Sequence, residues 1–442
     1  MLTRVCLRLA LLAAMPAWPQ VSSNVSDISM QTPPPVSGES YPVKIASEAR
    51  SNYLHAGIIV STAYNDNVLS GNGTNPVSDI SYSIRPTIAL DQTTPRLHQM
   101  LTYSPGFTFY QRTTALNEQD QGLAWEFQYR LSPHVTASLR EDFRKSSNVF
   151  NQSYLVSGVP ISGSAQSPQA AAVAPFASQL NNVANAELTY QFSANDMIGV
   201  SGNFTNLQYP DPKEVPGLSN SNSRSGLGFY SRRLSKTQYL GGIYQYSQFM
   251  SSPLNETPTV GESDTETNAA LLFYTIYLKS NLSFSLSAGP QHYVVFQPPS
   301  PATRAWEPAA TASIGWQGRR VGSAASYSRI VSGGGSLVGA YYTNAASASL
   351  RWQLARTWTV GPTASYLMTK NVNSSLATAN PGGHSISGAV SMEHAISGHF
   401  TLEFGYARIH QSYNNIAVIS SAPDANHEFL SISYQLTRPL GR

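Results

Sequence analysis

The stretch "YRLSPHVTASL" at residues 129–139 carries an apolar residue at every second position on both sides of a tight break. Tyr129 and Leu131 alternate up to the Ser-Pro-His break, and Val135 and Leu139 continue the alternation beyond it. Successive side chains of a β-strand point to opposite faces. The pattern therefore predicts a hairpin with one apolar face and one polar face.

The same figure returns along the chain as "YQFSANDMIGV" at 190–200 and "WQLARTWTV" at 352–360. From Tyr53 onward the alternating segments are separated in turn by short breaks, such as "SGH" at 397–399, and by long connections, such as 67–78. The number of breaks predicts about 18 strands, with 16 as the alternative. An even number of strands places both ends of the chain on the side of the short turns.

The composition excludes two common classes of protein. Charged residues make up only 12% of the 442 residues, whereas soluble domains average about 25%. Hydrophobic residues reach only 41%, and we find no run of about 20 apolar residues that would form a transmembrane helix. A closed sheet with lipid outside and water inside requires this mixture. The sequence predicts an all-β, antiparallel, up-and-down transmembrane β-barrel with short periplasmic turns and long extracellular loops.

Three segments are expected. Residues 1–20 read as a signal peptide for export. Arg4 and Arg8 come first, a short apolar run from Leu9 to Met15 follows, and small residues and Pro come after it. Residues 21–52 are rich in Ser and Pro and predict a flexible periplasmic linker, with a folded plug as the alternative. Residues 53–442 form the barrel. The single cysteine falls in the signal segment, so no cysteine-based metal site is expected.

Two motifs resemble those of known outer-membrane proteins. The segment "LSISYQL" at 430–436 is similar to the aromatic-rich last strand that the barrel-assembly machinery recognises, although "TRPLGR" follows it. The segment "VSTAYNDNVLSGN" at 60–72 resembles the first strand of an outer-membrane β-barrel porin family, some members of which are associated with exopolysaccharide export. The resemblance covers residues 53–442. It implies location in the outer membrane, with outer-membrane lipids, the assembly machinery and a small solute or polysaccharide as partners.

The strand phase also predicts which charged side chains line the lumen. A barrel of this size is too wide to be filled by side chains, so it encloses water unless loops enter it. The charged candidates are sparse and mixed in sign, whereas a strongly ion-selective pore needs a ring of one sign. The alternative is that Arg140, Asp142 and Arg144 form a neutralised ladder on the wall. The predicted lumen-lining residues are Glu126, Arg130, Arg140, Asp142, Arg144, Glu187, Arg351 and Glu403.

The longest connection, residues 146–182, occupies the position at which trimeric porins bend a loop into the channel. It contains no Asp, Glu, Lys, Arg or His. If it narrows the lumen, it does so with neutral side chains, which suits neutral solutes such as sugars. An external loop is the alternative.

The sequence predicts a porin-like channel for small, polar, neutral solutes. A component of exopolysaccharide export or envelope assembly is the alternative, and an outer-membrane hydrolase is the second alternative. We find no H-E-x-x-H, G-x-S-x-G or P-loop pattern, so no catalytic, metal or cofactor site is expected and the chain is not expected to be an enzyme. The net charge of +3 falls further on loss of Arg4 and Arg8 and gives no indication of nucleic-acid binding.

Overall fold

In the computed structural model, most of the chain forms β-strands that are connected in sequence order by turns and loops. The described residues are Met30, 32–37, 51–69, 76–147, 177–211, 213, 217–254, 261–278, 281–298, 300–372, 382–414 and 425–440. In this part of the chain no helix is both long and apolar enough to cross a membrane. The only helical turns described are α2 (Pro34–Ser37) and η3 (Thr114–Leu116).

Eighteen strands account for nearly all of the remaining described structure. They are β1 (Ser51–Asn65), β2 (Asp79–Thr93), β3 (Leu97–Tyr110), β4 (Glu118–Arg130), β5 (Val135–Ser146), β6 (Gln179–Gln191), β7 (Asp196–Gln208), β8 (Ser219–Ser235), β9 (Gln238–Pro253), β10 (Ser263–Leu278), β11 (Leu282–Gln297), β12 (Ser300–Gln317), β13 (Val321–Gly333), β14 (Ala340–Gln353), β15 (Trp358–Asn371), β16 (Gly383–Ala395), β17 (Phe400–Tyr413) and β18 (Ala425–Pro439).

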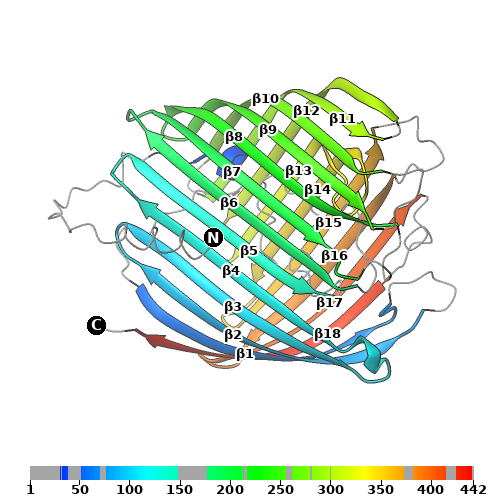
Figure 1. Ribbon diagram of the computed structural model, residues 1–442. Coiled ribbons are helices and arrows are strands. Elements are labelled where there is room, and N and C mark those ends of the chain that lie inside the picture. Colours follow the sequence, from blue (N-terminus) through cyan, green and yellow to red (C-terminus); the bar gives the residue numbers. More distant parts are fainter. Residues whose placement is uncertain are drawn as a thin grey trace, which may run out of the picture.

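The sheet closes on itself into a barrel (Figure 1). Each strand pairs antiparallel with the next, and β1 pairs with both β2 and β18. The closing register runs from Tyr53 opposite Pro439 to Asn65 opposite His427. Closure leaves no sheet edge with unpaired backbone groups along β1 and β18. The predicted closed antiparallel barrel of about 18 strands is confirmed.

Serine side chains build several of the short turns, beginning with the turn of the 129–139 hairpin. The Ser132 hydroxyl accepts hydrogen bonds from the backbone N–H groups of His134 (3.2 Å) and Val135 (3.1 Å). This is the local side-chain-to-backbone bond by which serine favours turns. Equivalent bonds to the second residue of the turn are made by Ser193, Ser235 and Ser397. These turns lie at what we call the short-turn end of the barrel.

The opposite, long-loop end carries the remaining connections. One of them is short, because only residues 298 and 299 separate β11 from β12. The others range from the six-residue β13–β14 loop to the 32 residues between Ser146 and Gln179. Apart from the β11–β12 turn, the alternation of short and longer connections agrees with the expectation from the sequence.

The two faces of the sheet differ as the alternation predicts. Large apolar side chains on the outer face are exposed, for example Val60 (50%), Leu272 (73%) and Trp306 (68%). Leu131 of the opening hairpin is 55% exposed. Since no layer of protein covers these side chains, water or lipid must do so.

Small hydroxyl side chains pair across neighbouring strands on the inner face. The Oγ atoms of Ser61 and Ser83 lie 2.5 Å apart, and the hydroxyls of Ser287 and Thr311 lie 2.6 Å apart. Three further pairs are Thr275–Ser285 (2.5 Å), Ser326–Ser347 (2.8 Å) and Ser365–Ser387 (2.6 Å). The inner wall therefore carries uncharged hydroxyl pairs at five of the seams between neighbouring strands.

One seam in the wall is only partly paired. β12 and β13 pair from Gln317 opposite Gly322 up to Ala310 opposite Arg329 and no further. Beyond that point Val331 exchanges two backbone hydrogen bonds of 2.9 Å with the side chain of Gln291 on β11. The long-loop end of β13 thus leaves β12 and lies inside the barrel wall.

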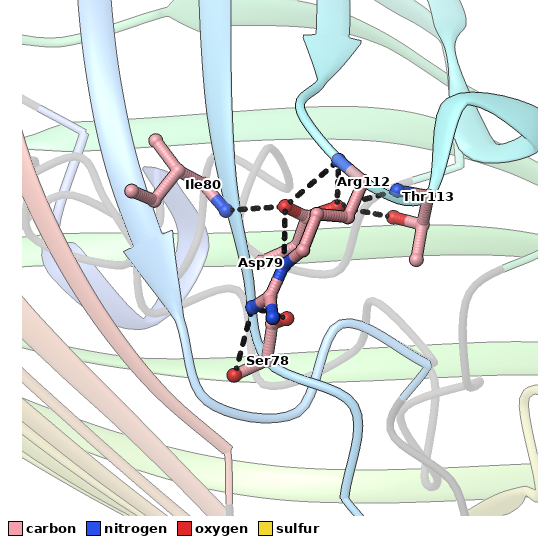
Figure 2. A network of polar contacts seen from close by, with 5 residues as sticks. All are labelled: Ser78, Asp79, Ile80, Arg112 and Thr113. Atoms are coloured by element: carbon pink, nitrogen blue, oxygen red, sulfur yellow. Dashed lines mark hydrogen bonds and ion pairs between the residues drawn. The ribbon is translucent and has the colours of Figure 1, made fainter.

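A buried aspartate fixes the rim at the long-loop end between β2 and β3 (Figure 2). The Asp79 carboxylate accepts the backbone N–H groups of Ile80 (2.7 Å), Arg112 (3.0 Å) and Thr113 (2.7 Å), and also the Thr113 hydroxyl (2.6 Å). The Arg112 guanidinium lies 3.7 Å away and donates to the Ser78 carbonyl, but this side chain is 66% exposed. An exposed ion pair contributes little, so the backbone donors carry the interaction.

We expect Asp79→Ala to destabilise the barrel by about 2–4 kcal/mol, because it leaves three backbone donors without their acceptor. Urea unfolding of the refolded protein measures this. Asp211→Ala is the matched control, since Asp211 is exposed on the same rim and accepts one backbone N–H, from Lys213. Equal midpoints for the two variants would contradict a structural role for Asp79.

Candidate functional site: the barrel lumen

The structure places the eight predicted lumen residues on five strands. Six of them share β4, β5 and β6, which are neighbours in the sheet, whereas Arg351 on β14 and Glu403 on β17 lie elsewhere on the wall. They alternate with outward side chains such as Leu188 and Trp352, which are 43% and 47% exposed. Their contact with a solute stays a prediction. The six clustered residues are Glu126, Arg130, Arg140, Asp142, Arg144 and Glu187.

Opposite charges adjoin one another within this cluster. Arg144 Nε lies 3.0 Å from Asp142 Oδ1, and Arg140 stands opposite Glu126 in the β4–β5 register. An ion pair between half-buried groups cancels most of the field that either charge would project into the lumen. This arrangement favours the neutralised ladder that the sequence left open as an alternative.

An apolar patch covers the inner wall from β7 to β12, and part of the N-terminal segment packs on it. Met30 is 7% exposed, and its backbone N–H donates to Gln191 Oε1 on β6 at 2.9 Å. Pro33 and Pro34 are buried, and the Pro33 carbonyl accepts the N–H of Val36 in the single turn of α2. The patch, called the apolar wall below, consists of Met197, Phe229, Tyr239, Ile243, Ala269, Leu271, Phe273, Tyr277 and Ala309.

Met30 and residues 32–37 therefore lie inside the barrel, with α2 drawn in dark blue behind β7 and β8 in Figure 1. These residues belong to the segment 21–52, predicted as a flexible linker with a folded plug as the alternative. Residues 21–29, 31 and 38–50 of that segment lie outside the described residues. We call Met30 and residues 32–37 the lumen segment.

Aromatic rings on the inner face lie against glycines of the neighbouring strand. A Cβ atom on Gly199 would lie 2.3 Å from the ring of Phe229, which stands directly opposite it in the register. The glycine gives the ring space to lie flat on the wall. Sequence reasoning missed these pairs, although an inward glycine opposite an inward aromatic residue is a usable signal. The other pairs are Gly241–Phe273, Gly383–Tyr413 and Gly405–Phe429.

A second obstruction lies at the long-loop end, where the β13–β14 loop folds inward. Its Ser336 carbonyl accepts the N–H of Ser219, at the start of β8, at 2.8 Å. Gly335 and Gly339 have φ angles of 60° and 110°, so the turn uses backbone conformations that favour glycine. Leu337 is 1% exposed and packs in a cluster with Ala177, Leu207, Tyr209, Leu218, Tyr341 and Tyr413. We call Gly334–Gly339 the constriction loop.

The constriction loop joins parts of the wall that are far apart in the strand order. Its cluster contains residues next to β6, β7 and β8 and the last residue of β17. Tyr209 directly follows β7, and burial raises the pKa of its hydroxyl, which keeps it neutral. The 146–182 connection, for which the sequence left a constriction or an external loop open, has its residues 148–176 outside the described structure. The glycine run "SGGGSLVG" was the available signal for the loop that does turn inward.

Within the described residues, no group of three or more His, Cys, Asp and Glu side chains could hold a metal ion. The inner surface that a solute would contact consists of paired hydroxyls, the apolar wall and neighbouring opposite charges on β4 and β5.

No protein-family model and no curated protein matches the chain. Among solved structures, it is similar to Pseudomonas aeruginosa OccK2 (OpdF), with 11% identity over 88% of this chain and 98% of that chain, at a TM-score of 0.43. The similarity to Pseudomonas aeruginosa OpdO has 10% identity over 89% of this chain and 99% of that chain, at a TM-score of 0.42. For the ferric citrate transporter FecA the identity is 11% over 88% of this chain, at a TM-score of 0.43, and the match spans only 66% of that chain. Likenesses at this level carry no argument about activity.

Proposed function

We propose that the chain is an outer-membrane channel for small, polar, neutral solutes. The observation that carries this proposal is a closed barrel whose outer face exposes large apolar side chains while its inner wall pairs small hydroxyls. An apolar outer band around a polar interior is the arrangement of transmembrane barrels.

Aromatic residues on the outer face support placement in a membrane. The outward Tyr244 hydroxyl donates to Asn268 Oδ1 at 2.8 Å, and the same diagonal pair recurs as Tyr327–Asn344 (3.1 Å) and Tyr406–Asn426 (2.5 Å). In each pair the asparagine lies nearer the long-loop end. Near the short-turn end, Trp316, Trp352 and Phe400 are 38%, 47% and 45% exposed. Two aromatic levels on one barrel suit the two membrane interfaces.

The inner wall favours neutral solutes over ions. Its paired hydroxyls both donate and accept hydrogen bonds, as the hydroxyl groups of sugars do. On β4 and β5, Arg144 is paired with Asp142, and Arg140 stands opposite Glu126. Glu393 and Glu403, which stand opposite each other on β16 and β17, form a local pair and not a ring around the lumen.

We expect the purified protein to carry open-channel current in planar bilayers. In a KCl gradient the reversal potential should lie near zero, with cation and anion permeabilities within about threefold of each other, because the predicted lumen charges on the described strands are mixed in sign and form no single-sign ring there. Liposome swelling should follow the size of neutral sugars. Absence of current together with ester hydrolysis would favour the hydrolase alternative instead.

The export alternative rests on the resemblance of residues 60–72. Loss of surface polymer on deletion of the gene, with solute uptake unchanged, would support it over the channel.

A further inference from the structure

A groove runs along the outer face of the barrel from β15 across β18 to β2. Its volume is about 630 Å³. Most of the side chains that line it point outward, including Val390, Phe404 and Leu430, which are 43%, 41% and 45% exposed. The groove therefore faces away from the lumen and is apolar. It can hold acyl chains but offers nothing to a polar solute in transit.

A group of basic side chains lies on the same outer face, next to the groove and nearer the long-loop end. Lys370 follows the outward Met368 on β15 by two residues, and His384 precedes the outward Ile386 on β16 by two. On β17, Arg408 and His410 follow the outward Tyr406, which lines the groove. We call Lys370, His384, Arg408 and His410 the basic cluster.

The register brings the members of the basic cluster together. His384 stands opposite Met368, so Lys370 is one strand away and two residues further along. The ring centroids of His384 and His410 are 5.7 Å apart. Arg408 stands opposite Gly388, whose outward side carries no side chain, and a Cβ atom there would meet nothing closer than 3.7 Å. This leaves a gap on the outer face opposite Arg408.

The acid nearest to this cluster among the groove residues is Glu428, which stands opposite Tyr406. Lys370 and Arg408 set two cations against it, and one further carboxylate, that of Asp66, is hydrogen-bonded to Asn426, which stands opposite Arg408. Arginine and lysine beside an open gap provide donors for phosphate oxygens. An anionic group held there would have the groove directly below it for attached acyl chains.

We propose that the outer face of β15–β18 is a seat for a phosphorylated lipid of the outer leaflet. The phosphate contacts the basic cluster over Gly388, and acyl chains lie in the groove lined by Val390, Phe404 and Leu430. Charge complementarity selects an anionic lipid, and the position of the cluster at the long-loop end selects the outer leaflet. The seat relies on the membrane placement proposed above but is independent of what passes through the lumen.

The test is native mass spectrometry of the full barrel released from nanodiscs that contain a phosphorylated glycolipid or its dephosphorylated form. We expect the wild type to retain the phosphorylated lipid. K370E/R408E should lower retention by about tenfold or more, since it reverses two cations at an anionic surface. The control R319E/R320E reverses two cations at the short-turn end and should leave retention unchanged.

Gly388→Phe gives a second test without a change of charge, because it fills the gap beside Arg408 and should also reduce retention. Heat-modifiable gel mobility confirms that each variant is folded. Equal retention by K370E/R408E and wild type, or equal retention of the dephosphorylated lipid, would overturn the proposal. All five substituted positions lie outside the lumen, so channel current should persist in every variant. Absence of current from the wild type would count against the channel and not against the lipid seat.

Discussion

Deleting residues 30–37 is expected to raise the single-channel conductance severalfold. The lumen segment packs against the apolar wall and is anchored to β6 through Gln191, so it occupies space through which a solute or ion would pass. Recordings of the deletion variant in planar bilayers measure the change. Deletion of residues 21–28 removes the same length of chain upstream of the segment and should leave the conductance as it is in the wild type.

The physical reason for a reversible block is the balance between weak binding and tethering. A fully buried apolar side chain contributes about 1.5–3 kcal/mol, so burial of Met30 and part of Val36 holds the segment on the wall only weakly. Only residues 38–50 separate the segment from β1, which keeps its effective concentration near the wall high. Wild-type traces should therefore show brief excursions to the conductance of the deletion variant.

Gln191→Ala isolates the anchor. It removes the acceptor of the Met30 N–H but keeps the segment, so we expect more frequent excursions with the two conductance levels unchanged. If the 30–37 deletion conducts as the wild type does, the segment does not obstruct the current path, and the constriction loop alone sets the conductance.

Period-two alternation was sufficient to predict the barrel. Residues such as Leu131 and Trp352 alternate with polar neighbours, and the structure places them on the exposed outer face. The short turns and the even number of strands followed from the same pattern. Each strand and each short turn depends only on residues within one hairpin, so the pattern can be read locally.

The contents of the lumen could not be predicted in this way. Alternation identifies an inward face but not what lies on it, and the partners of Met30 come from strands far away in the sequence. Pro33 and Pro34 read as part of a linker, because the sequence gives no sign of the distant strands inside which they are buried. In the same way, β13 alternates past Arg329 without any sign that it leaves β12 there.

Loop length also gave no signal for the β13–β14 loop. Its six residues turn inward through glycine conformations and the burial of Leu337, whereas residues 148–176 of the long, uncharged connection lie outside the described structure. The constriction loop enters the lumen because Leu337 packs there against apolar side chains, and most of these belong to strands and loops distant in the sequence.

Leu188→Arg is expected to destabilise the barrel strongly, and it tests which face of the sheet meets lipid. Leu188 is 43% exposed on the outer face of β6, opposite Val200 on β7 and Ala137 on β5. An arginine facing lipid near the bilayer midplane costs about 2–4 kcal/mol. We expect the variant either not to fold into phospholipid vesicles or to unfold at a urea midpoint lowered in proportion to this cost. Heat-modifiable gel mobility measures the folded fraction in both cases.

The adjacent residue supplies the matched control. Thr189 faces the lumen, on the same side as Glu187, so Thr189→Arg adds the same side chain to a wetted wall. It should fold into vesicles with a midpoint within about 1 kcal/mol of the wild type, as for a surface substitution. The reverse order of the two effects would require a dry interior and a wet exterior. That result would remove the basis for a membrane channel, because the hydroxyl-lined face would then no longer be the one that meets water.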